Sequence, residues 1–210
     1  MSNEELIGYL KSEAEKYESS ERYAHSLGVC EECLYYSHKL GLGEREQLVL
    51  SCAAILHDIS KDLPDYEVRA LCERGGLKYS PSPVLHQDTG AQFIKENYSA
   101  ALGDLTGDVA GAVSKHTTGG NNMSLCDMTL FVADFTEAGR KYQSCVKMRE
   151  YIHSECEKIV KKDRAAATLV MARAVYDICR MTIDHLNARG AVIDARTAAT
   201  EALMRSLIKE

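Results

Sequence analysis

The sequence of 210 residues has no tryptophan, only three prolines and no long apolar run. A helix that crosses a bilayer needs about 20 consecutive apolar residues, and no segment approaches that length, so we expect no membrane span. Because proline is scarce, long stretches rich in Ala, Leu, Glu and Lys continue without a helix breaker, and they lack the alternation that is typical of strands. The sequence therefore predicts an all-α fold.

An excess of positive charge is also missing. The chain has 31 acidic and 25 basic residues, which gives a formal net charge of −6 at pH 7. This balance disfavours a broad surface for nucleic acid or for a membrane, while a local basic pocket for a phosphate ligand stays compatible with it. Residues 1–5 are acidic and lack the basic-then-apolar order of a secretory signal. We expect a cytoplasmic protein without a nucleic-acid or membrane partner.

Cysteine, in contrast, occurs eight times. In a reducing cytoplasm these thiols are expected to be mostly free. Cys30 and Cys33 form a lone CxxC pair inside a predicted helix. A structural zinc site needs a second pair of ligands, which is missing, and the redox motif begins a helix after a strand. We interpret both cysteines as small thiols at the edge of the core.

The periodicity of apolar residues predicts one domain, residues 1–210, with a core of about 19–152 and with C-terminal helices in 155–210 that pack on it or extend from it. Ser82 and Pro83 are expected to begin a further helix. Gly190 is expected to divide the last two helices of the chain. The other expected helices are 3–17, 22–40, 48–56, 64–73, 103–115 and 124–152. A basic cluster, interpreted as a solvated face, comprises Lys158, Lys161, Lys162 and Arg164.

The most informative stretch is the apolar run from Leu48 to Leu56, which ends at His57 and Asp58. Burying an imidazole and a carboxylate at the end of an apolar helix is costly unless something pairs with them. A metal ion binds a neutral imidazole and an ionised carboxylate together. The run therefore predicts a metal centre and directs the search to further ligands.

Four more polar side chains lie beside apolar stripes or at the ends of other predicted helices: His25, His86, His116 and Asp134. Each histidine alone is typical of a capped or core histidine, whereas a carboxylate aimed at the core is rare without a partner. Six nitrogen and oxygen ligands without cysteine suit a transition metal such as Fe or Mn better than a structural zinc ion. Two metals that share a carboxylate accommodate six ligands better than one metal does.

The order His…His-Asp…Asp resembles that of the HD-domain superfamily of metal-dependent phosphohydrolases. Additional segments resemble the YqeK-type family of bacterial symmetrical bis(5'-nucleosyl)-tetraphosphatases between about Arg22 and Tyr142. The chain has Ala138 where that family usually has proline, and residues 87–89 also depart from its pattern. The segments that carry the resemblance are RYAHSLGV (22–29), HDISK (57–61), LH (85–86) with GA (90–91), HTTG (116–119), and ADFTE (133–137) with RKY (140–142).

This resemblance implies an HD-domain helical bundle with a buried dinuclear metal site. One metal would be held by His25, His57, Asp58 and Asp134. The second would be held by His86 and His116, with Asp58 bridging. The implied cofactors are two divalent or trivalent transition-metal ions, foremost iron, alone or with Mn, Mg or Zn. The implied reaction cleaves diadenosine tetraphosphate in the middle of its phosphate chain, giving two ADP through a metal-activated water.

Candidate substrate contacts lie next to these ligands. We assign Lys61 and Arg140, with Asp58, to the catalytic set, because a cation there could neutralise a phosphate. Arg22 is a further candidate, and for all three cations a surface ion pair is the alternative. Thr117 and Thr118, in a string that breaks a helix, could donate to a phosphate or could form a plain turn.

Other functions remain open at this point. Alarmone hydrolases share the His-Asp pair but typically carry acidic residues at positions 61 and 62, and Lys61 at the first of these counts against them. Another HD-type nucleotide phosphohydrolase or phosphodiesterase and a di-iron HD-fold oxygenase fit the same ligand set, although Lys61 and the string at 116–119 favour hydrolysis. A non-catalytic nucleotide-binding protein is a further alternative, against which the intact ligand set argues. The substrate is therefore expected to be a dinucleoside polyphosphate or another nucleotide. A homodimer through exposed helical faces is a further open prediction.

Overall fold

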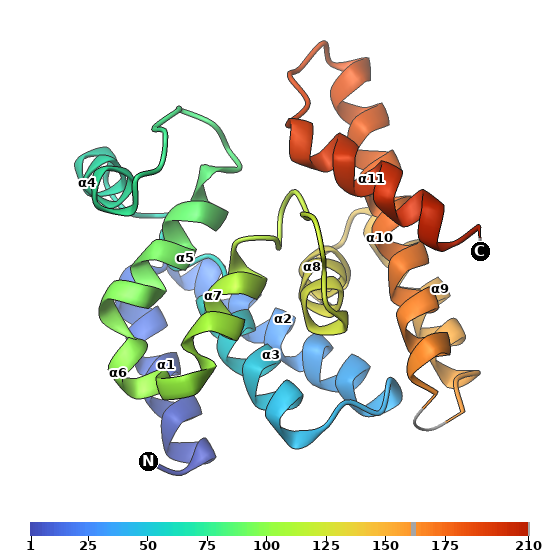
Figure 1. The fold of residues 1–210 in the computed structure, drawn as a ribbon, viewed down its shortest axis with the longest axis horizontal. Helices are drawn as coiled ribbons and strands as arrows, with labels where there is room; N and C mark the ends of the chain where they lie inside the picture. Colours follow the sequence, from blue (N-terminus) through green and yellow to red (C-terminus); the bar gives the residue numbers. More distant parts are fainter. Residues whose placement is uncertain (161–162, 210) are drawn as a thin grey trace.

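The computed structural model describes residues 1–160 and 163–209, and over these residues it contains helices and connecting turns but no strand. The predicted all-α fold is therefore confirmed. The α-helices are α1 (Asn3–Tyr17), α2 (Ser20–Lys39), α3 (Glu44–Leu56), α4 (Asp65–Gly75), α5 (Leu85–Asn97), α6 (Ser99–Leu102), α7 (Thr106–Val113), α8 (Leu125–Thr136), α9 (Gln143–Glu157), α10 (Arg164–Ala188) and α11 (Ala195–Leu207), with a short 3-10 turn at Gly103–Leu105 (Figure 1).

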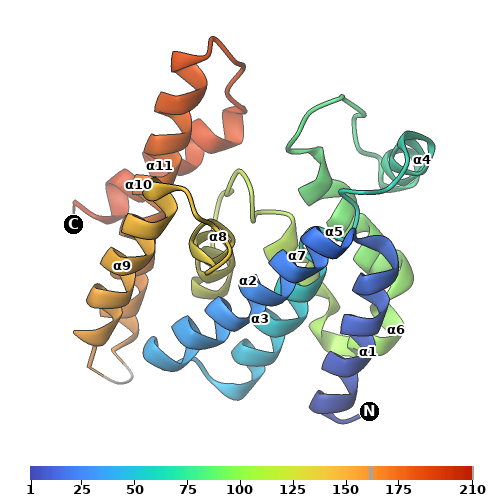
Figure 2. The same ribbon diagram turned by 180° about the vertical axis from the view of Figure 1, so that it is seen from behind.

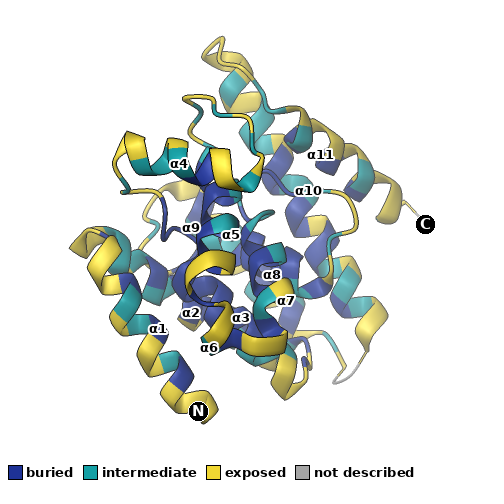
Figure 3. Ribbon diagram, turned by 60° about the vertical axis from the view of Figure 1, so that its left-hand side comes forward, coloured by how far each residue is buried: buried dark blue, intermediate teal, exposed yellow. Residues whose placement is uncertain are grey.

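Helix α3 occupies the centre of the molecule. It packs along α2 and also contacts α1, α7 and α8, while α5 packs on α7 (Figures 1 and 2). Every residue from Val49 to Leu56 is buried, as expected for a helix that is apolar on all sides. Buried residues gather on α2, α3 and α8, whereas α1, α4 and α11 present exposed outer faces (Figure 3). The apolar run in the sequence thus becomes the central helix, and its end delivers His57 and Asp58 into the interior.

Side chains that begin helices were only partly predictable. Ser19 caps α2, since its hydroxyl accepts a hydrogen bond from the backbone N–H of Arg22. Ser82 was expected to cap the following helix, but α5 begins at Leu85 with Val84 in the capping position. Residues 82–85 form a turn instead, because the N–H of Leu85 donates to the carbonyl of Ser82. The shift leaves His86 in the first turn of α5.

The prediction of one long helix over residues 124–152 is wrong. Helix α8 ends at Thr136, Glu137 turns to an extended backbone with φ −55° and ψ 154°, and α9 starts at Gln143. The guanidinium of Arg149 donates to the carbonyl oxygens of Thr136 and Glu137, at 2.8 and 2.6 Å. Because these bonds satisfy carbonyl groups at the end of α8, the helix can stop there without leaving buried acceptors unpaired.

The C-terminal helices α10 and α11 pack on each other, and α10 also contacts α8 and α9. The described members of the predicted basic cluster, Lys158 and Arg164, are exposed as expected, and Arg164 also pairs with Glu46 at 2.8 Å. Lys161 and Lys162 lie outside the described residues. The assignment of residues 1–210 to a single domain stays a prediction.

All eight cysteines are free, as the sequence predicted. Cys30 and Cys33 are buried, and burial raises the pKa of both thiols. They therefore act as small core residues, in line with the prediction. None of the helices in the described ranges is both long enough and apolar enough to span a bilayer.

Candidate metal centre

Five separate segments bring the six predicted ligands to one place. His25 comes from α2, His57 and Asp58 from the turn after α3, His86 from the start of α5, His116 from the turn after α7, and Asp134 from the end of α8. Their side chains form three overlapping groups in which all ligand atoms lie within 4.8 Å of one another. These groups are His25/His57/Asp58, His57/His116/Asp134 and Asp58/His86/His116.

Three of the histidines are oriented by the backbone. In His57, His86 and His116, Nδ1 lies 2.7 Å from the carbonyl oxygen of the residue three positions earlier. A carbonyl only accepts hydrogen bonds, so Nδ1 must carry the proton and donate it. The lone pair then sits on Nε2, which points into the cluster. This is the tautomer in which a histidine binds a metal through Nε2.

The surroundings of these Nε2 atoms indicate a missing partner. His57 is fully buried, and its Nε2 has no hydrogen-bond partner among the described residues. The Nε2 atoms of His86 and His116 face each other at 3.0 Å, an unfavourable approach for two lone pairs. Two ligand atoms at about 2.1 Å from one metal ion lie about 3 Å apart when they meet at a right angle. The residues therefore fit a bound metal, which would satisfy both features.

Asp58 reaches both halves of the cluster. Its Oδ2 lies 3.8 Å from Nε2 of His57, while its Oδ1 lies 3.4 Å from Nε2 of His86 and 3.6 Å from Nε2 of His116. The two oxygens of one carboxylate thus face different histidines. A carboxylate with this placement can be shared between two ions, the role that the resemblance implied for Asp58.

The protonation states in the cluster also suit a metal. Burial lowers the pKa of His57 to about 4 and that of His86 to about 3, so both imidazoles are neutral at physiological pH. Burial alone would raise the pKa of Asp58, but the positive charge of the adjacent Lys61 holds that pKa below its usual range. Neutral imidazole and ionised carboxylate are the forms that coordinate metals.

Glu137, which contacts His25, was not among the predicted site residues. Nε2 of His25 lies 2.9 Å from Oδ1 of Asp134, and its Nδ1 lies 3.2 Å from Oε1 of Glu137. Burial alone would lower the pKa of His25, but these two carboxylates raise it. Glu137 approaches α2 at Gly28, where an added Cβ would lie only 2.6 Å from Oε2 of Glu137. A glycine three residues after His25 was the available signal for this close approach.

The three predicted cations all reach the cluster. Nζ of Lys61 lies 3.1 and 3.0 Å from the two oxygens of Asp58, and Nη1 of Arg22 lies 2.9 Å from its Oδ2. Nη2 of Arg140 lies 2.7 Å from Oδ1 of Asp134. These side chains line a cavity of about 920 Å³, which we call the wide cavity, together with Asp58, His25, Lys141 and Tyr142 among others.

The turn after His116 is held by Gln87, a second residue that the sequence did not assign to the site. Oε1 of Gln87 accepts hydrogen bonds from the backbone N–H groups of Thr117 and Thr118, at 3.2 and 3.0 Å, and its Nε2 donates to the Thr118 hydroxyl at 2.7 Å. Thr118 is fully buried by these contacts. The Thr117 hydroxyl lies 3.1 Å from Nε2 of His86, at the cluster itself.

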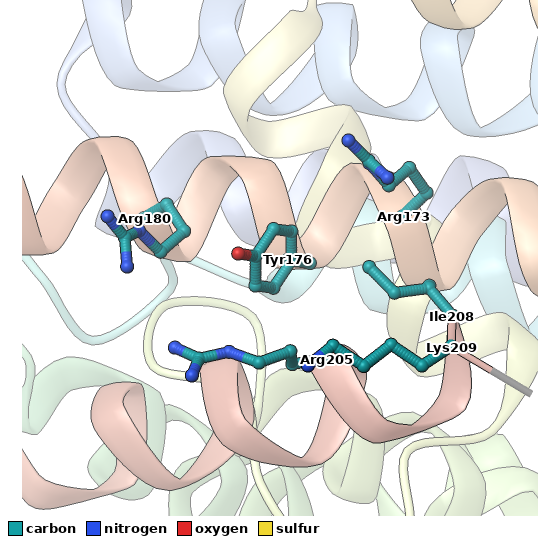
Figure 4. Close-up of a pocket in the computed structure, with 6 residues that line it drawn as sticks. All are labelled: Arg173, Tyr176, Arg180, Arg205, Ile208 and Lys209. Carbon is teal, nitrogen blue, oxygen red and sulfur yellow. The ribbon is translucent and has the colours of Figure 1, made fainter.

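A separate hollow of about 440 Å³ lies between α10 and α11, away from the histidines (Figure 4). Its arginines are paired with carboxylates. Arg173 contacts Asp177 at 3.1 Å, and Arg180 and Arg205 share the buried Glu201. None of the described residues that line the hollow is a histidine, a cysteine or a carboxylate, so the hollow is no candidate for a metal site.

A fold of packed helices with a buried cluster of four histidines and two aspartates defines a class of metal-dependent enzymes. The family model described as "HD domain" matches residues 22–139, and the chain belongs to this family. The matched range contains all six predicted ligands. The prediction of an HD-domain helical bundle is therefore confirmed.

Two named relatives show which group within the family this chain is similar to. A protein of Halalkalibacterium halodurans named bis(5'-nucleosyl)-tetraphosphatase, symmetrical, is 30% identical over 132 residues, which cover 61% of this chain and 67% of the relative. A protein of Bacillus subtilis with the same name is 24% identical over 160 residues, covering 74% of this chain and 80% of the relative. The predicted resemblance to this group, and the prediction of a hydrolytic enzyme, are confirmed.

A solved structure shares the fold over nearly the whole chain. It is the crystal structure of a predicted HD superfamily hydrolase involved in NAD metabolism from Clostridium acetobutylicum, with a TM-score of 0.73 and 21% sequence identity. The match covers 98% of each chain. At this identity the match establishes the fold alone, and it extends that likeness through the C-terminal helices beyond the HD-matched range.

Proposed function

We propose that the protein cleaves dinucleoside tetraphosphates symmetrically, so that diadenosine tetraphosphate and water give two ADP. The observation that carries the proposal is the wide cavity, in which three cations meet the carboxylates of the histidine–aspartate cluster. The cations match the charge of a polyphosphate. The names of the two relatives support this choice of substrate over other nucleotides.

The proposed cofactors are two transition-metal ions, with iron preferred. A donor set of imidazole and carboxylate groups supports Fe or Mn over ions that favour thiolates. His25, His57, Asp58 and Asp134 would hold one ion, and His86 and His116 would hold the other, with Asp58 shared. When bound, such ions lower the pKa of a coordinated water to about 7 and offset charge on phosphate oxygens.

The chain's own residues have positioning and binding roles in this proposal. Lys61, Arg140 and Arg22 bind phosphate oxygens and so hold the polyphosphate over the cluster. The reaction joins the oxygen of a water molecule to one inner phosphorus atom and breaks the bond between that phosphorus and the central bridging oxygen. The bridging oxygen departs with its electron pair on the second ADP, and the proton lost by water passes to solvent.

Product analysis under controlled oxygen tests this function. Purified protein is loaded separately with Fe, Mn, Mg or Zn and incubated with diadenosine tetraphosphate and with a panel of ordinary nucleotides. We expect ADP as the sole product, at equal rates with and without oxygen. ATP with AMP would contradict symmetric cleavage, a requirement for oxygen would indicate an oxygenase, and binding without turnover would indicate a nucleotide sensor.

We also infer that the protein works in the cytoplasm. Its eight cysteines carry no disulfide bond, which is typical of a reducing compartment. A homodimer stays a prediction, to be checked by light scattering of the purified protein.

A further inference from the structure

Two cavities meet at Lys61. The wide cavity lies on one side, and a narrow cavity of about 360 Å³ lies on the other. The connection between α4 and α5, which stands out from the rest of the chain, forms one wall of the narrow cavity (Figure 1). The narrow cavity is lined by Lys61, Asp65, Tyr79, Ser80, Pro83 and His86, among others.

The histidine–aspartate cluster lies between these cavities. His25 lines the wide cavity and His86 lines the narrow one. Asp58 connects them, because its Oδ2 lies 2.9 Å from Nη1 of Arg22 on the wide side and its Oδ1 lies 3.4 Å from Nε2 of His86 on the narrow side. A linear ligand that extended from one cavity to the other would therefore pass over Asp58 and Lys61.

The two cavities differ in charge. The wide cavity is lined by Arg22, Lys61, Arg140 and Lys141. Among the described residues that line the narrow cavity, Lys61 is the only lysine or arginine, and it lies where the two cavities meet. The wide cavity thus suits a polyphosphate, whereas the narrow cavity suits a largely uncharged group attached to one. Both volumes fall within the range of about 300–1,000 Å³ that is usual for small-molecule sites.

The wall of the narrow cavity is braced in a way that suits a flat, polar-edged ligand. The guanidinium of Arg69 lies 3.8 Å from the ring centroid of Tyr79, and the Tyr79 hydroxyl donates to Asp65, which also pairs with Arg69 at 2.6 Å. The lining therefore combines aromatic and apolar surface with hydroxyl and carboxylate acceptors. Ribose hydroxyls and base amino groups donate hydrogen bonds, and a base has apolar faces, so a nucleoside matches this lining.

We propose that the narrow cavity binds one nucleoside of a dinucleoside polyphosphate, while the phosphate chain crosses Lys61 into the wide cavity. The inference rests on the proposed function and deepens it. The wide cavity, at about 920 Å³, has room for the second nucleoside beyond the phosphate chain, so the middle of that chain lies over Asp58 and its histidines. Symmetric cleavage then follows from the placement of the cluster between two nucleoside-binding cavities.

Variants that fill the narrow cavity test this inference. Ser80→Trp and Val68→Phe each add a bulky side chain to its lining and alter no predicted metal ligand. Ser154→Trp makes the same exchange at an exposed position of α9 and serves as the matched control. Helix content and metal content are measured for each variant, and two different filling variants ensure that a folding defect in one does not decide the outcome.

The readout compares ligands with two nucleosides or one. Diadenosine tetraphosphate is the substrate, and adenosine 5'-tetraphosphate, with the same number of phosphates, is the competing inhibitor. In the metal-loaded filling variants we expect KM for the substrate to rise about tenfold or more, while the inhibition constant of the one-nucleoside compound changes by about twofold or less, because that compound can place its nucleoside in the wide cavity. The control should leave both constants unchanged.

Two results would overturn the inference, and they are distinguishable. If the wild-type protein cleaves the substrate but the folded filling variants change neither constant, or change both equally, the narrow cavity binds no nucleoside and the proposed function stands. If the metal-loaded wild-type protein does not cleave diadenosine tetraphosphate at all, the proposed function fails and this inference fails with it.

Discussion

Oε1 of Glu137, at the end of α8, lies 3.2 Å from Nδ1 of His25 on α2. The opposite ring nitrogen of His25 faces Asp134 at 2.9 Å. Glu137 is therefore an orienting residue for the first histidine of the cluster, although the two residues are 112 positions apart in the chain. Loss of a residue that orients a metal-binding histidine in this way typically costs about 10- to 100-fold in metal affinity or activity.

Glu137→Gln should weaken metal binding without unfolding the protein. The amide keeps the shape of the side chain but removes the charge that orients His25, so we expect metal affinity or turnover to fall by about 10- to 100-fold. Metal titration and steady-state kinetics measure the change, and circular dichroism should show unchanged helix content. Glu150→Gln, the same exchange at an exposed position of α9, is the control. Equal metal affinity in the wild-type protein and Glu137→Gln would contradict the role.

Gly28→Ala should produce a similar defect from the opposite helix. The added Cβ would lie 2.6 Å from Oε2 of Glu137 and would push that carboxylate away from His25. Replacing a helical glycine by alanine favours the helix by up to about 1 kcal/mol, so thermal stability should be preserved while metal affinity falls. Gly8→Ala in α1, where nothing lies near the added Cβ, is the matched control.

The link between these positions can be measured with a double variant. Because Gly28→Ala acts by displacing Glu137, the loss in Gly28→Ala combined with Glu137→Gln should be smaller than the sum of the single losses. Strict additivity of the two free-energy changes would show that the positions act independently, and would refute the proposed displacement.

His57→Ala and Asp58→Ala should remove both metal and activity. His57 offers a fully buried Nε2 with no other partner among the described residues, and Asp58 faces both halves of the cluster. We expect turnover to fall by more than about 100-fold, beyond the effect of a supporting residue, while much of the helix content remains. Elemental analysis, turnover and circular dichroism are the measurements. Retained metal with normal turnover in both variants would refute the assignment of the cluster as a metal site.

The central helix and the gathering of ligands were predictable because their chemistry is visible in the sequence. An apolar run such as 48–56 must be covered on all sides, and this requirement places it in the core. His57 and Asp58 at its end, and Asp134 on an apolar face, are groups that must find partners once buried. The convergence of the six side chains follows from that need together with the resemblance of the motif order.

The supporting contacts were not predictable because they join distant parts of the chain. The predicted helix over 124–152 breaks at Glu137. There Arg149 donates to the carbonyl groups that end α8, and His25 contacts the Glu137 side chain. Gly139 gave only a weak local signal for that break. Gln87 likewise acts on the turn at Thr117, 30 residues further along the chain. Local propensity contains no information about such partners.

Glu18, at the end of α1, should make the protein's stability depend on pH. Its side chain is buried beside α2. Burial raises the pKa of Glu18 from 4.5 to about 7, and Asp58 adds to the rise, while Ser26 and Arg22 oppose it. The folded protein therefore keeps this proton over a pH range in which the unfolded chain has already released it.

The sign of the effect follows from this difference. A group with a raised pKa in the folded state favours folding at pH values below its unfolded pKa, and this contribution is lost as the pH rises through its folded pKa. Between about pH 4.5 and 7 the wild-type protein should lose about 2 to 3 kcal/mol of unfolding free energy through Glu18. Glu18→Gln cannot titrate, so its unfolding free energy minus that of the wild-type protein should increase by this amount over the same range and level off above pH 7. Urea unfolding of both proteins at several pH values measures this difference directly, and a difference that stays constant from pH 5 to 8 would show that Glu18 has an ordinary pKa in the folded state.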